Sequence, residues 1–465
     1  MVDPHLAATH PTRRDLLSVL RSPRTIRARC AAITQAVTDD RSGWFRIDRA
    51  RLPEAAARVV AVMRRRFPDL RIPIHSRWRH FEAGGIDRKA ELDAAIAHLS
   101  VADRARAHFD LTVVSVLLDA GAGAQWGYVD RGAVLPVAAL PAERVSRDDL
   151  LAMLDQATAA PAAPAAPAVV PVPADNPRYT RSEGLGVATF RAFMAGAFSS
   201  DRAQPCRVDA AALRQVDAAA LRAIFQSSPS NPLVGLEGRA GLLQRLGEAL
   251  VAEAARDGLS ARPSLLYDRM TAGGRARDVS ASDVLLHVLQ ALAPIWTSGS
   301  MVMGVRAGDV WEHRWAGVST GDGEDTVTRG WVPFHKLSQW LSYSLLEPLQ
   351  WAGVTVTGLD ELTGLPEYRN GGLLIDTGVI VPRNPRLPDR RWKPADEVIV
   401  EWRALTVTLL DELAHQVRAQ LGVTAEQMPL ACILEGGTWT AGRETAADLR
   451  GGAPPLQIDS DGTIF

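Results

Sequence analysis

The sequence has few of the residues that form disulfide frameworks, zinc sites or membrane spans. Its 465 residues include three cysteines, Cys30, Cys206 and Cys432, which are far apart and lack CxxC spacing. This excludes a disulfide framework and a thiolate zinc site, and it suits a reducing cytosol. No apolar run approaches the ~18 residues of a membrane span, and the polar first residues lack the apolar segment of a signal peptide. We therefore expect a cytoplasmic protein without a membrane partner.

The sequence also lacks an excess of charge of either sign. A net charge of -1 and a pI near 6.8 argue against a general electrostatic grip on DNA or RNA, so no nucleic-acid partner is expected. With 47% hydrophobic and 23% charged residues, the composition is that of a globular protein. The length suggests two or three domains, and the oligomeric state is left unknown.

Strand signals are scarce, so the predicted fold class is mainly α. Ser22-Pro23 favours a helix start, and Ser282 is predicted to cap a helix that ends at Pro294. The apolar run 109–118 fits a strand or a buried helix equally well. The Asp-Gly turn in LQIDSDGTIF predicts a small C-terminal hairpin. Apolar residues at helical spacing predict further helices at 52–67, 89–99, 185–197, 210–225, 236–256 and 397–421.

A segment of Ala, Pro and Val suggests how the chain is divided. Residues 157–176 carry prolines too often for a continuous helix, and they are predicted to form a semi-extended linker insertion. We therefore expect an N-terminal helical region at 1–156, which contributes HSRWRHF to the site. A second helical region, with the terminal hairpin, is expected at 177–465.

Two familiar site patterns do not fit. The glycines of 121–127 are spaced GxGxxxG, one residue longer than a dinucleotide fingerprint, and Pro136 blocks the crossover helix. We expect a loop at a helix end. His75 and His80 are five residues apart without a third ligand nearby, so a structural or substrate-contacting role is favoured over zinc. Neither a metal nor an organic cofactor is expected.

A basic and aromatic segment at 75–81 has two interpretations. Arg77, Arg79 and His80 alternate with Trp78 and Phe81. Such a segment can hold a phosphate or carboxylate beside a planar group. It can equally be a solvated basic turn with Trp78 in the core. Both interpretations remain open.

The sharpest pair of charged residues lies in the segment 332–379. His335 and Lys336 stand at a predicted helix start, and Glu367 follows Pro366 in the first turn of another. The helix dipole and a neighbouring ammonium would both lower the pKa of this carboxyl. Such a carboxylate suits stabilising or attacking a cationic sugar transition state, and Lys336 suits an anion such as phosphate. The alternative is a salt bridge between two helices.

Several long sequence words resemble those of one family. They are IPIHSRWRHFEAGGIDR (72–88), LRAIFQ (221–226), NPLVGLEGRAGLL (231–243), VPFHKLSQWLSYSLLEPL (332–349), LTGLPEYRNGGLL (362–374) and LEGGTWTAGR (434–443). Over nearly the whole chain the sequence resembles the uracil-catabolism family of the URC pathway, long labelled a domain of unknown function. This resemblance implies that the protein acts on nucleotides, in a pathway that yields urea through ring-opened, ribosylurea-type species.

A remoter resemblance is to the queuosine-salvage proteins, nucleotide N-glycosylases with a helical fold similar to DNA glycosylases. The similar words are FHKLSQ (334–339), LTGLPEYRN (362–370), EWRALTV (401–407) and VGLEGR (234–239). The resemblance implies a DNA-glycosylase-like helical core, with that family's catalytic lysine at Lys336 and its catalytic aspartate at Glu367. Two departures are the Glu in place of Asp, and Asn370-Gly371 in place of Val-Pro. The predicted substrate-binding residues are His335, Gln339, Tyr368, Arg369, Asn370, His75, Arg77, Arg79, His80, Glu237, Glu401 and Arg403.

The sequence therefore predicts a small-molecule enzyme of uracil breakdown. We expect it to hydrolyse the N-glycosidic bond of a ring-opened uracil nucleotide, releasing urea or a ureido product and ribose 5-phosphate. Glu367 would stabilise the sugar cation or attack it, while Lys336 and Arg369 would position phosphate or ribose. The alternatives are a ureido or amide hydrolase, a non-catalytic nucleotide-binding protein, and a nucleic-acid glycosylase, which the charge disfavours.

Overall fold

The structure is a computed structural model that describes residues 18–119, 121–123, 125–132, 177–296, 299–317 and 328–459. The predicted linker at 157–176, Pro136 and the Asp461-Gly462 turn lie outside the described residues. None of the described helices is long and apolar enough to cross a membrane.

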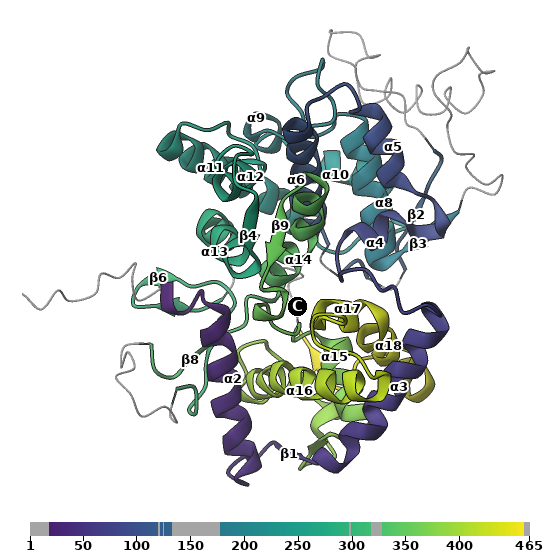
Figure 1. The fold of residues 1–465 in the computed structure, drawn as a ribbon, viewed down its shortest axis with the longest axis vertical. Coiled ribbons are helices and arrows are strands. Elements are labelled where there is room, and N and C mark those ends of the chain that lie inside the picture. The colour runs from purple at the N-terminus through teal and green to yellow at the C-terminus, as the bar shows by residue number, and fades with distance from the viewer. Residues whose placement is uncertain are drawn as a thin grey trace, which may run out of the picture. The chain divides into compact units, whose positions relative to one another are not determined.

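The mainly α fold is confirmed, because helices make up most of the described chain (Figure 1). The α-helices are α2 (Pro23–Thr38), α3 (Leu52–Arg66), α4 (Trp78–Phe81), α5 (Arg88–Ala95), α6 (Val101–Leu117), α8 (Arg181–Met194), α9 (Ala210–Leu213), α10 (Ala218–Ile224), α11 (Leu236–Asp257), α12 (Leu265–Thr271), α13 (Ala281–Leu292), α14 (Lys336–Trp351), α15 (Tyr368–Asp376), α16 (Glu397–Leu421), α17 (Leu430–Ile433) and α18 (Trp439–Arg450). The predicted similarity to DNA glycosylases stays a prediction.

The strands are two or three residues long and form two-stranded sheets only, within the described ranges. The antiparallel pairs are β1 (Phe45–Ile47) with β10 (Ile380–Pro382), β2 (Gly127–Val129) with β3 (Arg178–Thr180), β5 (Met301–Val302) with β6 (Val305–Arg306), and β7 (Val310–Glu312) with β8 (Trp331–Pro333). The parallel pairs are β4 (Asp278–Ser280) with β9 (Thr355–Thr357), and β11 (Arg391–Trp392) with β12 (Gln457–Ile458).

The chain forms two compact units that do not follow the predicted division. Unit 1 combines Met1–Ser76 with Leu266–Phe465, and unit 2 is the continuous segment Arg77–Leu265. The reason is long-range packing, since α2 and α3 from the N-terminal part pack against α16. Periodicity along a sequence shows which face of a helix is buried, but not against which partner.

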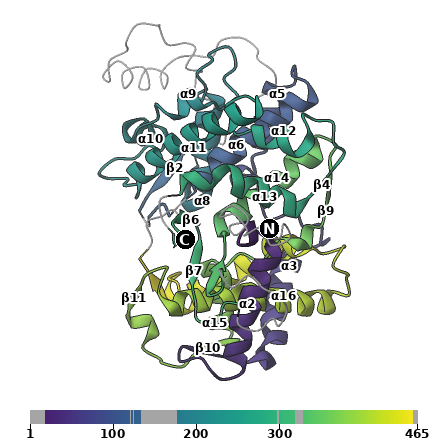
Figure 2. The same ribbon diagram turned by 90° about the vertical axis from the view of Figure 1, so that its left-hand side faces the viewer.

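Unit 1 is organised around α16, which begins and ends at the residues predicted from its pattern. Figure 1 shows α16 running between α2 and α3, and Figure 2 shows it from the side. α15 packs against both α16 and α18. α15, which carries part of the predicted site, therefore packs directly on the core of unit 1.

Unit 2 resolves the ambiguity of the apolar run 109–118. This run belongs to α6, whose residues from Ala107 to Leu117 are all buried. Because this part of α6 is covered on all sides, its apolar residues are not confined to one face, which explains the ambiguous pattern. The glycine-rich stretch that starts at Gly121 follows α6 as a loop, as predicted.

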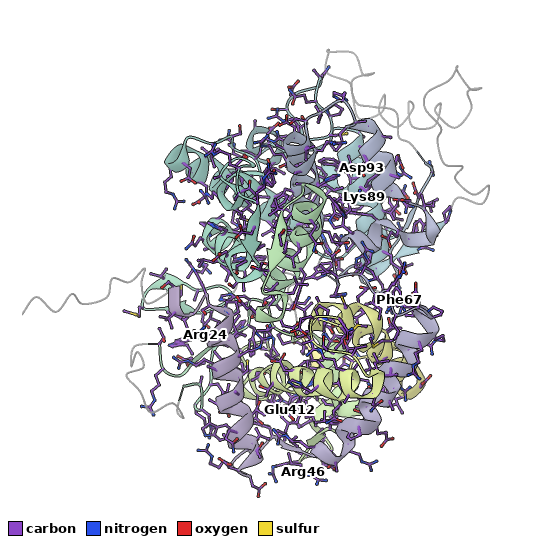
Figure 3. All side chains as sticks on the ribbon, viewed as in Figure 1. Arg24, Arg46, Phe67, Lys89, Asp93 and Glu412 are labelled. Carbon is purple, nitrogen blue, oxygen red and sulfur yellow. The ribbon has the colours of Figure 1, made fainter. Side chains whose placement is uncertain are left out.

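On the surface, Lys89 and Asp93 of α5 form an ion pair one turn apart (Figure 3).

Two local predictions need correction. The helix expected at 210–225 is two helices, because Asp217 accepts a hydrogen bond from the Ala220 N–H at 2.7 Å and starts α10 anew. The N-cap of α13 is Ser280, two residues before the predicted Ser282. At the C-terminus, β12 pairs with β11 in parallel, and the turn and second arm of the predicted hairpin lie outside the described residues, so the hairpin stays a prediction.

Candidate functional site

Arg403 and Asp309 form a buried ion pair at the centre of unit 1. The guanidinium of Arg403, on α16, donates two hydrogen bonds to the Asp309 carboxylate, at 2.7 and 2.8 Å. It also lies over the Phe334 ring, 4.2 Å from its centroid, and its Nε donates to the Pro366 carbonyl at 3.3 Å. Phe334 and Pro366 directly precede the starts of α14 and α15. One arginine thus fixes both helix entrances.

Asp309 also starts α14. Its carboxylate accepts the Lys336 backbone N–H at 3.0 Å, and its carbonyl accepts the Phe334 N–H at 2.9 Å. His335 precedes Lys336 in a left-handed conformation, with φ of 48°, and its Nε2 lies 2.9 Å from the Leu20 carbonyl. Burial lowers the pKa of this imidazole to about 4. His335 therefore turns the chain into α14, and Lys336 becomes the first residue of that helix.

Glu367 starts α15 as its N-cap, one position earlier than the predicted first turn. Its side chain is buried, and its two oxygens accept the backbone N–H groups of Arg369 at 2.7 Å and Asn370 at 2.6 Å. The Asn370 side chain donates to the Leu365 carbonyl at 3.1 Å, and the buried Gln339 side chain is hydrogen-bonded to Thr363. These bonds hold the loop before α15 against α14, so the carboxylate has a fixed orientation.

The electrostatics of Glu367 differ from the sequence prediction. Burial raises the pKa of its carboxyl, and this effect exceeds the opposing effects of the two backbone hydrogen bonds and of the Lys336 and Arg369 charges. The predicted lowering influences are therefore present, but the predicted low pKa is wrong. The reason is that helix periodicity did not indicate a fully desolvated carboxyl. The structure does bring Lys336 within electrostatic reach of Glu367.

Arg369 is a buried cation without a carboxylate partner among the described residues. It is 4% exposed, its Nη1 donates to the Gly452 carbonyl at 3.1 Å, and it lies 4.8 Å from the Tyr368 ring centroid. Within the described ranges, its buried Nε has no hydrogen-bond partner. A buried guanidinium with an unbonded N–H is costly, so this position favours an anion.

Glu401 lies away from this centre. Its Oε1 accepts the Ser42 hydroxyl at 2.5 Å, and its Oε2 lies 3.6 Å from Nε2 of the buried His313. Positions 401 and 403 point to different sides of α16, because two residues turn a helix by about 200°. Of the two predicted residues on this helix, only Arg403 reaches the starts of α14 and α15.

The basic segment at 75–81 divides at the boundary between the units. Arg77 is fully buried in unit 2, where it donates to Ser115 at 2.7 Å and to the Ser182 carbonyl at 3.1 Å. Its Nη1 also lies 3.2 Å from Asp119. Trp78 is buried beside Phe81. For Arg77 and Trp78 the geometry is that of the core interpretation rather than the ligand-binding one.

The other predicted residues of unit 2 are placed as follows. Arg79 forms a 3.1 Å ion pair with Glu82, and His80 packs near Gly186. Glu237 is exposed in the first turn of α11. The neighbouring Arg239 is buried and donates to the Leu118 carbonyl at 3.0 Å, so the LEGR word has a structural role at least in part. None of these residues belongs to unit 1.

His75 belongs to unit 1 and has a partner that the sequence prediction missed. Its Nδ1 lies 2.8 Å from Oε2 of Glu435. Asp309 was missed as well. Glu435 belongs to LEGGTWTAGR (434–443), which indicated the family but not a site. No local pattern marks Asp309 as a site residue. Among the described residues, no group of three or more His, Cys, Asp or Glu side chains could hold a metal ion.

Comparison with known proteins places the chain in a family. Residues 19–153 and 171–465 match the family described as "Protein of unknown function (DUF1688)", and the chain belongs to it. It is 34% identical over 463 residues to "Protein urg3" of Schizosaccharomyces pombe, which covers 97% of this chain and 99% of that protein. It is also 34% identical over 422 residues to "Uracil catabolism protein 4" of Lachancea kluyveri, with 85% of each chain covered. The family resemblance predicted from the sequence words is confirmed.

Proposed function

We propose that this protein acts in uracil catabolism as an N-glycosidase. Its substrate would be a ring-opened uracil nucleotide of the ribosylurea type, and ribosylurea 5′-phosphate and water would give urea and ribose 5-phosphate. The name of one relative, "Uracil catabolism protein 4", supports the pathway. The observation that carries the reaction is the buried Glu367 carboxylate, which two backbone N–H groups orient beside the charge of Lys336.

The burial of Glu367 suits a cationic transition state. When the C1′–N bond breaks, positive charge develops on C1′ and the ring oxygen of the ribose. A carboxylate in a desolvated site is poorly stabilised in the free enzyme, as the raised pKa of Glu367 indicates. An arriving cationic centre replaces the missing solvation, and the attraction is strong because little water screens it. The interaction therefore grows as the reaction proceeds, which lowers the barrier.

Arg369 and Lys336 would hold the 5′-phosphate. Arg369 supplies a buried guanidinium without a carboxylate partner in the described chain, and its place in the first turn of α15 is two residues from Glu367. Arginine binds phosphate with short, charge-assisted hydrogen bonds. Phosphate bound there would place the ribose of the same molecule close to Glu367. This assignment makes the enzyme specific for nucleotides over nucleosides.

The experiment is turnover of ribosylurea 5′-phosphate by the wild type and by Glu367→Gln. We expect kcat/KM to fall at least about 10³-fold, the scale of losing one preorganised electrostatic partner of a transition state. Glu412→Gln changes a surface carboxylate of α16, paired with Arg49, and should leave turnover unchanged. Full activity of Glu367→Gln would contradict the catalytic assignment. Substrate binding without turnover by the wild type would instead indicate a non-catalytic protein.

A further inference from the structure

His75 and Glu435 form a buried pair in unit 1 to which the reaction above gives no role. His75 Nδ1 and Glu435 Oε2 are 2.8 Å apart, and the Glu435 Oε1 accepts a hydrogen bond from Arg66 at 3.0 Å. The His75 backbone N–H is fixed on the Ala431 carbonyl at 3.1 Å. Burial acts to raise the pKa of Glu435, but the hydrogen bond from His75 and the Arg66 charge hold it below its ordinary value. An ionised carboxylate at this distance keeps a proton on Nδ1 and presents Nε2 as the reactive nitrogen.

The backbone around Glu435 has an unusual form. Residues Leu434–Thr438 make a π-helical turn between α17 and α18. Such turns are rare and occur frequently at functional sites. Here Gly436 and Gly437 permit it, because a Cβ at either position would lie within 3.0 Å of α3 or Ile72 side chains. The turn sets Glu435 in the position where it meets His75.

Two contacts show that the His75–Glu435 pair lies towards the end of α15 that begins at Glu367. α18 lies parallel to α15, since a Cβ at Gly442 would overlap the Arg369 carbonyl while Arg450 pairs with Asp376 at 2.7 Å. Because Gly442 lies level with Arg369, Glu367 lies level with position 440 of the other helix. Glu435 stands five residues before that position, which is roughly 7 Å along the helix axis. The π-helical turn also contacts α15.

The His75 ring also lies near α14, the helix that begins at Lys336. Its centroid lies 6.4 Å from the ring centroid of Trp340. Trp340 follows Lys336 by four residues on α14, so the two side chains share one face of that helix. The His75 side chain is 12% exposed and is hydrogen-bonded through Nδ1. Its Nε2 makes no hydrogen bond with the described part of the chain.

The proposed reaction needs a proton donor that Glu367 does not supply. A ureido group cannot leave as a free anion, so its nitrogen must gain a proton as the C1′–N bond breaks. Both oxygens of Glu367 already accept backbone N–H groups, which suits an unprotonated carboxylate. His75 and Glu435 form a titratable pair that contacts both helices of the site, His75 through Trp340 of α14 and the turn of Glu435 through α15.

We infer that His75, oriented by Glu435, protonates the leaving ureido nitrogen. This inference rests on the proposed function. The bonding electrons of C1′–N pass to nitrogen, which takes the proton of His75 Nε2 and departs as urea. Water then adds to C1′ and returns one proton to Nε2, so the enzyme is regenerated. His75 is the acid, and Glu435 is a positioning residue that keeps the proton on Nδ1.

The test compares two leaving groups. Ribosylurea 5′-phosphate requires protonation, whereas 4-nitrophenyl riboside 5′-phosphate releases an anion that is stable without it. His75→Gln should lower kcat/KM for the first substrate by about 10²- to 10⁴-fold, the range of general acid catalysis, and for the second by less than about tenfold. Glu435→Gln should show the same pattern, more weakly. His108→Gln alters another His–carboxylate pair, in which the buried His108 lies 2.8 Å from Asp93 in unit 2, and should spare the ratio.

The possible outcomes separate the two proposals. Equal loss on both substrates, or no loss on either, would overturn the role of His75 while the N-glycosidase activity of the wild type stands. A wild type that cleaves neither substrate would instead refute the proposed function. His75→Ala with added imidazole gives an independent readout. Imidazole should restore turnover of the ribosylurea and leave that of the nitrophenyl substrate unchanged; no restoration would count against the proton donor.

Discussion

The Asp309–Arg403 pair offers the most quantitative prediction about unit 1. The perturbation is a double-mutant cycle of Asp309→Asn and Arg403→Met. Asp309 accepts N–H groups from Arg403, from Lys336 and from Trp311 Nε1 at 2.7 Å, while the Arg403 side chain is 1% exposed. Each single change therefore leaves a buried group without its opposite charge.

The structure sets the expected magnitude. Removing one partner of a buried ion pair costs about 3–5 kcal/mol of unfolding free energy, because the remaining charge stays desolvated. The double variant leaves neither charge behind. It should therefore be less destabilised than the sum of the single variants, by at least about 2 kcal/mol. Part of the cost of Asp309→Asn remains in the double variant, since the amide still replaces a helix-starting carboxylate.

Urea unfolding followed by tryptophan fluorescence measures this coupling. The matched control is the cycle of Arg49→Met and Glu412→Gln, which removes a two-pronged ion pair at 2.8 and 3.0 Å (Glu412 is labelled in Figure 3). That pair is largely solvated, so its coupling should stay below about 1 kcal/mol. Additive effects at Asp309 and Arg403 would refute the claim that this pair holds the starts of α14 and α15.

Two further predictions concern single side chains. Arg369→Met should raise KM for the phosphorylated substrate roughly 10- to 100-fold, because it removes one charged hydrogen bond to the phosphate. The control is Arg450→Met, which removes a cation paired with Asp376 at 2.7 Å and should leave KM unchanged. Equal KM values for the wild type and Arg369→Met would exclude the phosphate role. Burial lowers the pKa of His335 from 6.5 to about 4, so its contribution to stability is complete above pH 6.5 and is lost as the pH falls towards 4. Between pH 7 and pH 5 the wild type should thus lose about 2 kcal/mol more than His335→Asn, and parallel curves of unfolding free energy against pH would contradict this.

The helices could be predicted from the sequence where local pattern decides them. α16 begins and ends where its pattern indicates, and α3 begins at the predicted residue beside Pro53. Local pattern failed where a capping side chain decided. Asp217 divides one apolar pattern into two helices, and Ser280 rather than Ser282 starts α13. The division into units escaped prediction because it depends on which distant helices pack together.

The site could be predicted only in part. Lys336 and Glu367 were identified from helix-start chemistry and resemblance, and the structure sets their charges within reach of each other. Asp309 directly precedes β7 with no motif around it, and only folding brings it to the start of α14 and to Arg403, 94 residues away. The direction of the Glu367 pKa shift depends on burial, which follows from tertiary packing rather than from neighbours in sequence.

The most direct test of the central claim is identification of the products. Purified wild-type protein would be incubated with ribosylurea 5′-phosphate, and the mixture separated and analysed by mass spectrometry against a protein-free control. We expect urea and ribose 5-phosphate in equal amounts. Ammonia released while the ribose stays bonded to nitrogen would contradict it, because the ureido bond and not the C1′–N bond would then be the one cleaved.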